Sequence, residues 1–369
     1  MLLDLPAGPP ELTLHYRHDL MRHIFRAVYA GGSCAVVGLR GAGLSNALRF
    51  SAEPRVIANY LNPLVLSTLP IYLETGWLTQ PADLQREIVK QLVRTAELFN
   101  FPKADQTALH YLEQQLDQAT VPDDVLSKAV TLLCHTPQHR LIFIFDEFDQ
   151  PFLQLPAPAL RRLRQLRDEH KLGVCYVVGT LRELSDLNRQ RAAHGEAVDK
   201  FTELFDEDTY PLPPYSPADA REVIARKTFD WPQRPTADDE EQLYRLAGGH
   251  AKLLVALLRF WESRQHLEWN RIERAAEQDQ HLLDLCAMIW DDLNDGERFA
   301  LFALSADRRA EIPPADLERL RKKGLIIGRP PGVFANLFEA YIETQGPIAP
   351  AAQAAPASRL RELDPDIQW

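Results

Sequence analysis

Short apolar runs alternate with amphipathic stretches along the first half of the chain. Cys34–Val37 is a β-branched run that ends in glycines, and Leu141–Phe145 and Val174–Val178 are continuous apolar runs. Such runs suit parallel strands that are covered on both faces. Between them, leucine, isoleucine and alanine recur at helical spacing, as in Leu84–Ala96. The alternation predicts an α/β unit with an open parallel sheet over residues 12–215.

Weaker signals add three elements to this unit. Ile71–Leu73 is short and β-branched, which is consistent with a second strand. A helix is expected from Ala47 onward, and another from Pro122 to about Cys134.

From Leu212 the strand pattern stops and only helical spacing continues. Ser216–Asp219 and Thr236–Asp239 have the spacing of N-terminal capping signals, and Leu253–Trp261 is a strongly apolar helical stretch. This pattern of capping signals and helical spacing predicts a helical lid subdomain over residues 216–282.

The C-terminal part reads as three helices followed by two short strands around a turn. The strands are expected at Leu325–Ile327 and Val333–Ala335, and the combination predicts a winged-helix domain over residues 283–345. Residues 1–11 form an N-terminal arm. Residues 346–369 contain four prolines and six alanines and end in large apolar side chains, which predicts a flexible tail with a terminal docking segment.

Composition narrows the class of protein. The chain has 369 residues, 46% of them hydrophobic and 25% charged, and this length predicts more than one domain. No apolar run approaches the roughly 18 residues of a membrane span, which excludes a membrane protein of that kind. The N-terminus lacks the pattern of a secretory signal, so we expect a cytoplasmic protein. Four scattered cysteines without a CxxC pair argue against a disulfide framework, and the net charge of -11 argues against coating nucleic acid electrostatically.

The stretch GLRGAGLS, Gly38–Ser45, lies between a predicted strand and a predicted helix. It matches the phosphate-binding pattern G-x-x-x-x-G-K-[ST] at every position but one. The glycines let backbone amides surround phosphates, and the hydroxyl of Ser45 is placed to hold Mg²⁺. Leu44 stands where the pattern has the lysine that reaches the β- and γ-phosphates. The sequence thus predicts nucleotide contacts for Gly38, Arg40, Gly41, Gly43, Leu44, Ser45 and Asn46.

The loss of the lysine predicts which property suffers most. A hydrogen bond to a charged group contributes about 1.5 to 3 kcal/mol, so nucleotide binding can survive in weakened form. Removing a preorganised donor from a developing charge costs about 10² to 10³ in rate, so hydrolysis should suffer more. Arg40 either supplies a replacement charge or faces solvent.

Polar residues follow the predicted strands Leu141–Phe145 and Val174–Val178 at their carboxyl ends. Asp146 is placed to hold the Mg²⁺ shell, and Glu147 is placed to polarise an attacking water. Thr180 is placed to sense the γ-phosphate, and Arg182 is placed to reach it. The carboxyl ends of parallel strands form the crevice in which such sheets bind ligands.

The order GLRGAGLS, LIFIFDEFD, GTLR, LPPYSPADA and LAGGHAKLL, followed by a winged helix, resembles the STAND class of AAA+-like ATPases, with kinship to ATPases of the origin-recognition type. The resemblance covers about residues 12–345 and implies a P-loop domain, a helical lid and ATP or ADP with Mg²⁺. Gly248–His250 resembles the family's GGHP turn, whose proline is Ala251 here, and implies that His250 contacts the nucleotide. Tyr16–Asp19 lies where the family has a short motif near the adenine.

The resemblance implies a nucleotide-controlled regulatory switch or scaffold, of a kind found in signalling and defence. With Leu44 in the loop, we expect weak nucleotide binding, little hydrolysis and action through a protein partner or self-assembly. One alternative is an ATPase that uses the winged helix on duplex DNA, where Arg319, Arg321, Lys322 and Lys323 cluster. Against it, Asp284–Glu343 holds 11 acidic and 8 basic residues, a net of -3. Another alternative is a structural adaptor whose phosphate loop is empty.

Overall fold

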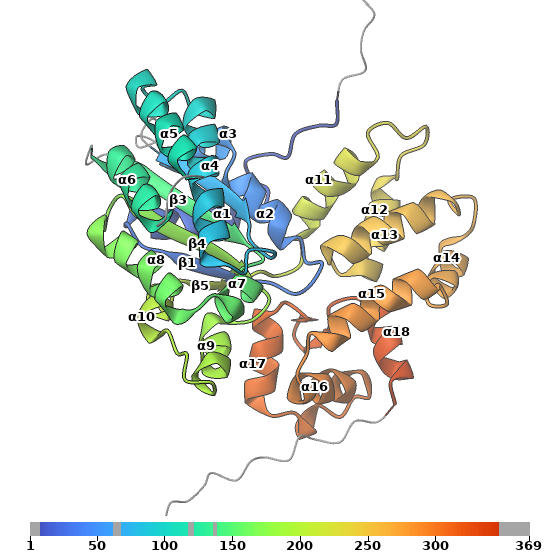
Figure 1. The fold of residues 1–369 in the computed structure, drawn as a ribbon. Helices are drawn as coiled ribbons and strands as arrows, with labels where there is room; N and C mark the ends of the chain where they lie inside the picture. Colours follow the sequence, from blue (N-terminus) through green and yellow to red (C-terminus); the bar gives the residue numbers. More distant parts are fainter. Residues whose placement is uncertain (1–7, 62–67, 117–121, 136–138, 347–369) are drawn as a thin grey trace, which may run out of the picture.

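The structure is a computed structural model that describes residues 8–61, 68–116, 122–135 and 139–346. The predicted tail beyond residue 346 and most of the N-terminal arm lie outside the described residues. Figure 1 shows an α/β unit on one side and two groups of helices from the second half of the chain on the other. No helix among the described residues is long and apolar enough to cross a membrane.

The α/β unit is built on a five-stranded sheet in the order β2-β3-β4-β1-β5. Every neighbouring pair is parallel, as the runs of buried apolar residues predict. Its strands are β1 (Cys34–Val37), β2 (Thr68–Glu74), β3 (Arg140–Asp146), β4 (Val174–Thr180) and β5 (Thr209–Pro211). The second strand is longer than predicted, since Thr68, Leu69 and Pro70 also pair with β3.

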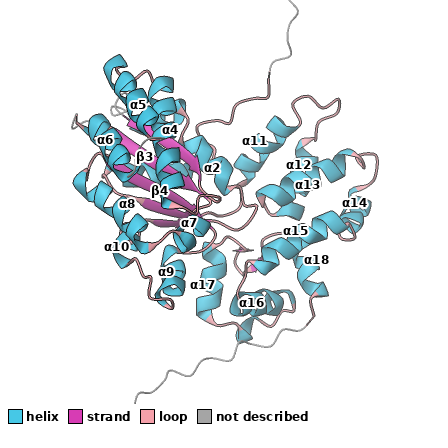
Figure 2. Ribbon diagram, in the orientation of Figure 1, coloured by secondary structure: helices cyan, strands magenta, loops and turns pink. Residues whose placement is uncertain are grey.

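Alternate residues of each strand enter two separate hydrophobic clusters. In β3, Ile142 and Ile144 join the cluster beneath α1–α3, whereas Leu141, Phe143 and Phe145 join the cluster beneath α4–α10. The helices of the first cluster are α1 (His18–Tyr29), α2 (Leu44–Ser51) and α3 (Pro54–Leu61). Those of the second are α4 (Pro81–Leu98), α5 (Lys103–Gln115), α6 (Pro122–Cys134), α7 (Asp149–Gln154), α8 (Ala157–Glu169), α9 (Leu184–Ala192) and α10 (Asp199–Thr202). The predicted fold class, an α/β unit with an open parallel sheet, is confirmed, and helices cover both faces of the sheet (Figure 2).

Helices follow one another after β5, as the loss of strand signals predicts. We call residues 216–282 the lid, after the role predicted for them, and their helices are α11 (Pro217–Lys227), α12 (Ala237–Ala247), α13 (Ala251–Glu262) and α14 (Trp269–Ala276). Both predicted capping signals form complete capping boxes, in which the Ser216 and Thr236 side chains accept from the amides of Asp219 and Asp239.

The last described elements combine helices with one small antiparallel sheet. They are α15 (Gln280–Asp291), α16 (Asp295–Ser305), the short 3₁₀ helix η2 (Arg309–Glu311), α17 (Pro314–Lys322), β6 (Ile326–Ile327), β7 (Gly332–Val333) and α18 (Asn336–Thr344). We call residues 280–346 the C-terminal module. The two predicted strands are present but shorter, and the assignment of this module as a winged helix stays a prediction.

Candidate functional site

The phosphate loop connects β1 to α2, as predicted, and α2 begins at Leu44 rather than at Ala47. Gly43 lies immediately before the helix with φ 89°, and a Cβ there would approach the hydroxyl of Tyr215 to 2.9 Å. Only glycine fits that backbone conformation at that distance. The loop therefore delivers the free amides of a helix N-terminus to the carboxyl edge of the sheet, the geometry that binds anions.

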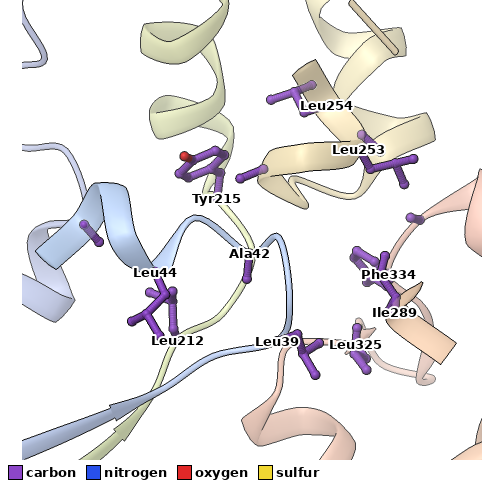
Figure 3. Packing of buried hydrophobic residues seen from close by; sticks show 14 of the residues in the cluster. Leu39, Ala42, Leu44, Leu212, Tyr215, Leu253, Leu254, Ile289, Leu325 and Phe334 are labelled. Atoms are coloured by element: carbon purple, nitrogen blue, oxygen red, sulfur yellow. The ribbon is translucent and has the colours of Figure 1, made fainter. Parts of the chain in front are cut away.

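Leu44 is part of the hydrophobic core and only 8% exposed. A Cβ built on Gly38 or Gly179 would lie 3.5 or 3.3 Å from atoms of the Leu44 side chain. Figure 3 shows this side chain beside Leu212, below the loop. The position of the expected lysine is thus used for packing, and burying a leucine there stabilises the fold by about 1.5 to 3 kcal/mol.

A cavity of about 900 Å³ opens above the loop, between the sheet edge and the lid. It brings together most of the predicted site residues: Arg40, Gly41, Gly43, Leu44, Ser45, Asn46, Asp146, Glu147 and Thr180. The remaining three, Gly38, Arg182 and His250, lie outside its lining. Five basic side chains line it, from Arg40, Arg49, Arg226, Lys227 and Lys252, against four acidic ones, from Glu53, Asp146, Glu147 and Asp149.

Several polar groups that face this cavity have no protein partner among the described residues. Thr180 is fully buried, and its hydroxyl makes no hydrogen bond. An unsatisfied buried hydroxyl destabilises a fold unless a water or ligand meets it. The side chains of Ser45 and Asn46 line the same cavity. These groups fit a polyanion such as the phosphates of a nucleotide.

The two carboxylates at the end of β3 have different surroundings. Asp146 is 2% exposed, and its two oxygens accept from the Tyr72 hydroxyl at 2.7 Å and from the Glu147 amide at 3.0 Å. Glu147 is exposed and has φ 56°, a strained conformation for a non-glycine residue that is often found at functional sites. Gly76 makes room for it, because a Cβ there would lie 2.5 Å from Glu147 Oε2.

The segment after β4 is held by Asp149, which accepts from the amides of Leu181 at 2.8 Å and Arg182 at 3.3 Å. Burial raises the pKa of Asp149, although these amide hydrogen bonds oppose the shift. The Arg182 side chain is exposed and donates to Gln190 at 3.2 Å, so it points along α9 rather than into the cavity.

His250 contacts the back of the phosphate loop. It is fully buried, and burial lowers its pKa to about 4, so the ring is neutral at pH 7. Its Nδ1 accepts from the Leu253 amide at 3.4 Å, which assigns the proton to Nε2, and Nε2 donates to the Arg40 carbonyl at 3.1 Å. His250 therefore supports the loop by a hydrogen bond and carries no charge toward a phosphate.

Arg40 connects the loop to the C-terminal module. Its amide and its Nε donate to the two carboxylate oxygens of Asp292 at 2.8 and 2.5 Å. The sequence left two alternatives for Arg40, a replacement charge or a side chain that faces solvent. The structure instead shows an ion pair with Asp292, the residue that caps the C-terminus of α15. Figure 3 places Leu39 of the loop and Leu325 and Phe334 of the C-terminal module in the same buried cluster.

Lys252 is the main cavity residue that sequence reasoning missed. It lies in the first turn of α13, its amide donates to the Gly41 carbonyl at 2.9 Å, and its side chain lines the cavity. The lysine follows His250 by two positions in LAGGHAKLL, but nothing in the local sequence shows that this turn meets a loop about 210 residues away. Arg49, which also lines the cavity, and Tyr72, which hydrogen-bonds to Asp146 without lining the cavity, were missed because their partners lie 25 and 74 positions away in the sequence.

The Tyr16–Asp19 segment ties the N-terminal helix to the loop and the lid. Tyr16 is buried, and its hydroxyl is 3.1 Å from that of Tyr215. The Arg17 guanidinium donates to the Ala42 carbonyl at 2.9 Å and lies 4.2 Å from the centre of the Tyr215 ring. The segment thus supports the loop at a third point.

No known protein-family model matches this chain, and no curated protein matches it. Solved structures do resemble it. The ORC2 protein of Aeropyrum pernix in its ADP form is 14% identical, with a TM-score of 0.53 over 93% of this chain and 97% of that one. The Walker-type ATPase of Pyrococcus abyssi is 14% identical, with a TM-score of 0.53 over 93% of this chain and all (100%) of that one. These likenesses show the fold, a parallel α/β sheet of the P-loop type followed by a C-terminal domain.

Proposed function

We propose that this chain is a nucleotide-responsive regulatory switch, which binds ATP or ADP weakly, hydrolyses little and acts through a protein partner or self-assembly. One observation carries the proposal: the lid and the C-terminal module both hold the phosphate loop directly. His250 and Lys252 bond to the carbonyls of Arg40 and Gly41, and Asp292 bonds to Arg40. A ligand that changes the loop therefore acts on both regions at once.

The residues fit a nucleotide in a definite way. The loop amides, Ser45 and Thr180 would meet the phosphates, and Lys252 would supply a cationic contact. When a Mg²⁺ ion accompanies the nucleotide, Asp146 and Ser45 are the residues that would hold it, and the ion would neutralise phosphate charge. Leu44 leaves one charged contact unmade, and this weakens affinity by roughly 10- to 100-fold relative to a lysine.

Nucleotide binding and movement are tested together. The switch predicts that ADP and ATP bind in calorimetry and that they change the distance between labels at Tyr111→Cys and Glu343→Cys, two exposed positions on α5 and α18. Cys134 is partly exposed and would react with the label, so it is replaced by alanine first. The other three cysteines are buried and can stay. Since a ligand shifts an equilibrium only through unequal affinity for two states, binding without a distance change would contradict the switch. Failure of both nucleotides to bind would favour the structural adaptor.

The DNA-binding alternative receives less support from the C-terminal module. Of the four clustered basic residues, Lys323 and Arg319 lie 2.8 and 3.9 Å from the carboxylate of Glu297, which is fully buried. Gly324 packs against Pro213 and Pro214 of the linker to the lid. This part of the module is thus used within the chain.

A further inference from the structure

Tyr72 hydrogen-bonds to a carboxylate oxygen of Asp146 that the water molecules around a bound metal ion would need. Its hydroxyl donates to Asp146 Oδ2 at 2.7 Å, while Oδ1 already accepts from the Glu147 amide. Asp146 is almost fully buried, so its carboxylate has little room for further partners. A water bound to a divalent cation would have to compete with the tyrosine for this carboxylate.

Arg49 places a positive charge beside Tyr72, the partner of that carboxylate. Its guanidinium lies 5.3 Å from the centre of the Tyr72 ring and forms an ion pair with Glu74, the last residue of β2. Arg49 follows Ser45 by four residues in α2, so the two side chains share one face of the helix, and both line the cavity.

We propose that Tyr72 and Arg49 make this site bind nucleotide with little dependence on a divalent cation. Tyr72 is a positioning residue that competes with the metal for Asp146, and Arg49 supplies in part the positive charge that the cation would bring. The inference rests on the proposed nucleotide binding and names its ionic requirement, a nucleoside polyphosphate taken up without its metal. It also gives a second reason, besides Leu44, for slow hydrolysis, since phosphoryl transfer depends on the metal to neutralise developing charge.

The test is the ratio of nucleotide affinities in excess magnesium chloride and in excess EDTA, measured by calorimetry on the full chain with ADP. The wild-type chain should bind ADP with similar affinity in both. Tyr72→Phe frees Asp146 and should raise the ratio by about 10-fold, the value of one hydrogen bond to a charged group. Arg49→Gln should lower the affinity for ADP in EDTA, and it should lower the affinity less in magnesium chloride.

Two control variants carry similar changes at residues that neither contact Asp146 nor line the cavity. Tyr60→Phe removes a tyrosine hydroxyl on α3, and Arg308→Gln removes an arginine that also combines an ion pair, with Glu311, and a ring contact, with Phe302. Both should leave the ratio at the wild-type value. The Arg49 side chain is half exposed, so Arg49→Gln should fold. This variant therefore still tests the proposal if Tyr72→Phe fails to fold.

The outcomes separate this inference from the function on which it rests. If wild-type chain binds ADP only with magnesium, or if both variants keep the wild-type ratio, the inference is wrong while the switch stands. If wild-type chain binds ADP in neither condition, the proposed function fails and this inference fails with it.

Discussion

The two sides of the phosphate loop are built in opposite ways. On the cavity side, Thr180 has an unsatisfied hydroxyl, and Ser45 faces open space. On the outer side, the loop carbonyls and amides are bonded by His250, Lys252 and Asp292. An unmet polar group in a cavity lining is available to a ligand, whereas hydrogen-bonded groups hold parts of a fold together. Substitutions on the outer side should therefore change stability, and those on the cavity side should change binding.

The largest expected effect comes from the outer side. His250→Ala removes the hydrogen bond to the Arg40 carbonyl and the N-terminal cap of α13 and leaves a small void. Together these losses should lower the free energy of unfolding by about 3 kcal/mol. Urea unfolding measures the change. Ser45→Ala, on the cavity side, is the control and should shift stability by less than about 0.5 kcal/mol. Equal losses in both variants would contradict the contrast between the two sides.

Acid should weaken the same junction. His250 has a pKa of about 4 in the folded chain, below the ordinary value of 6.5, so the unfolded chain binds more protons between these values. Its contribution is therefore complete above pH 6.5 and falls by up to about 3 kcal/mol as the pH drops to 4. His250→Asn keeps a capping side chain that does not titrate. The difference between the two stability curves should grow with pH from 4 to 6.5, and parallel curves would show that His250 is not the titrating group.

Lys252 belongs to both sides, because its amide bonds the loop and its side chain lines the cavity. Lys252→Met keeps the amide bond and removes the charge, so affinity for ADP should fall by about 10-fold with little change in stability. Calorimetry measures the affinity. Arg259→Met removes a charge from the same helix outside the cavity lining and should bind like wild type. An unchanged affinity for Lys252→Met would remove this residue from the site.

Leu44→Lys exchanges packing for charge. An amine that extends into the cavity should tighten ADP binding by about 10-fold. Loss of the buried leucine should at the same time lower stability by about 2 kcal/mol. Leu44→Met is the control, since it preserves most of the packing and should leave affinity unchanged. A lysine that tightens nothing would indicate that the side chain at this position cannot reach the phosphates.

Thr180→Val should have the smallest effect, and it should change stability and ATP affinity in opposite directions. Replacing an unsatisfied buried hydroxyl by a methyl group should stabilise the free protein by up to about 1 kcal/mol. The same change should weaken binding of ATP, because the hydroxyl is kept for a ligand. Thermal unfolding without nucleotide measures the first effect. Destabilisation would mean that a protein group or bound water already satisfies this hydroxyl.

Much of the α/β unit follows from local patterns. β1, β3 and β4 are continuous apolar runs, and the capping boxes at Ser216 and Thr236 depend on contacts between residues three positions apart. The sequence predicts only part of β2, because the apolar run there is short. Pairing with β3 extends the strand. The predicted loop, carboxylates and Thr180 meet at one sheet edge because parallel strands bring their carboxyl ends together.

By itself, the sequence determined the fold class, the phosphate loop with its missing lysine, and the two carboxylates at the end of β3, because each depends on residue type and short-range spacing. Only the tertiary structure decided what each side chain does. It buried Leu44, turned Arg40 toward Asp292 and Arg182 toward Gln190, and brought Lys252 to the loop. Such contacts join residues that lie from 8 to 252 positions apart. They depend on how helices pack in three dimensions, which no local pattern records.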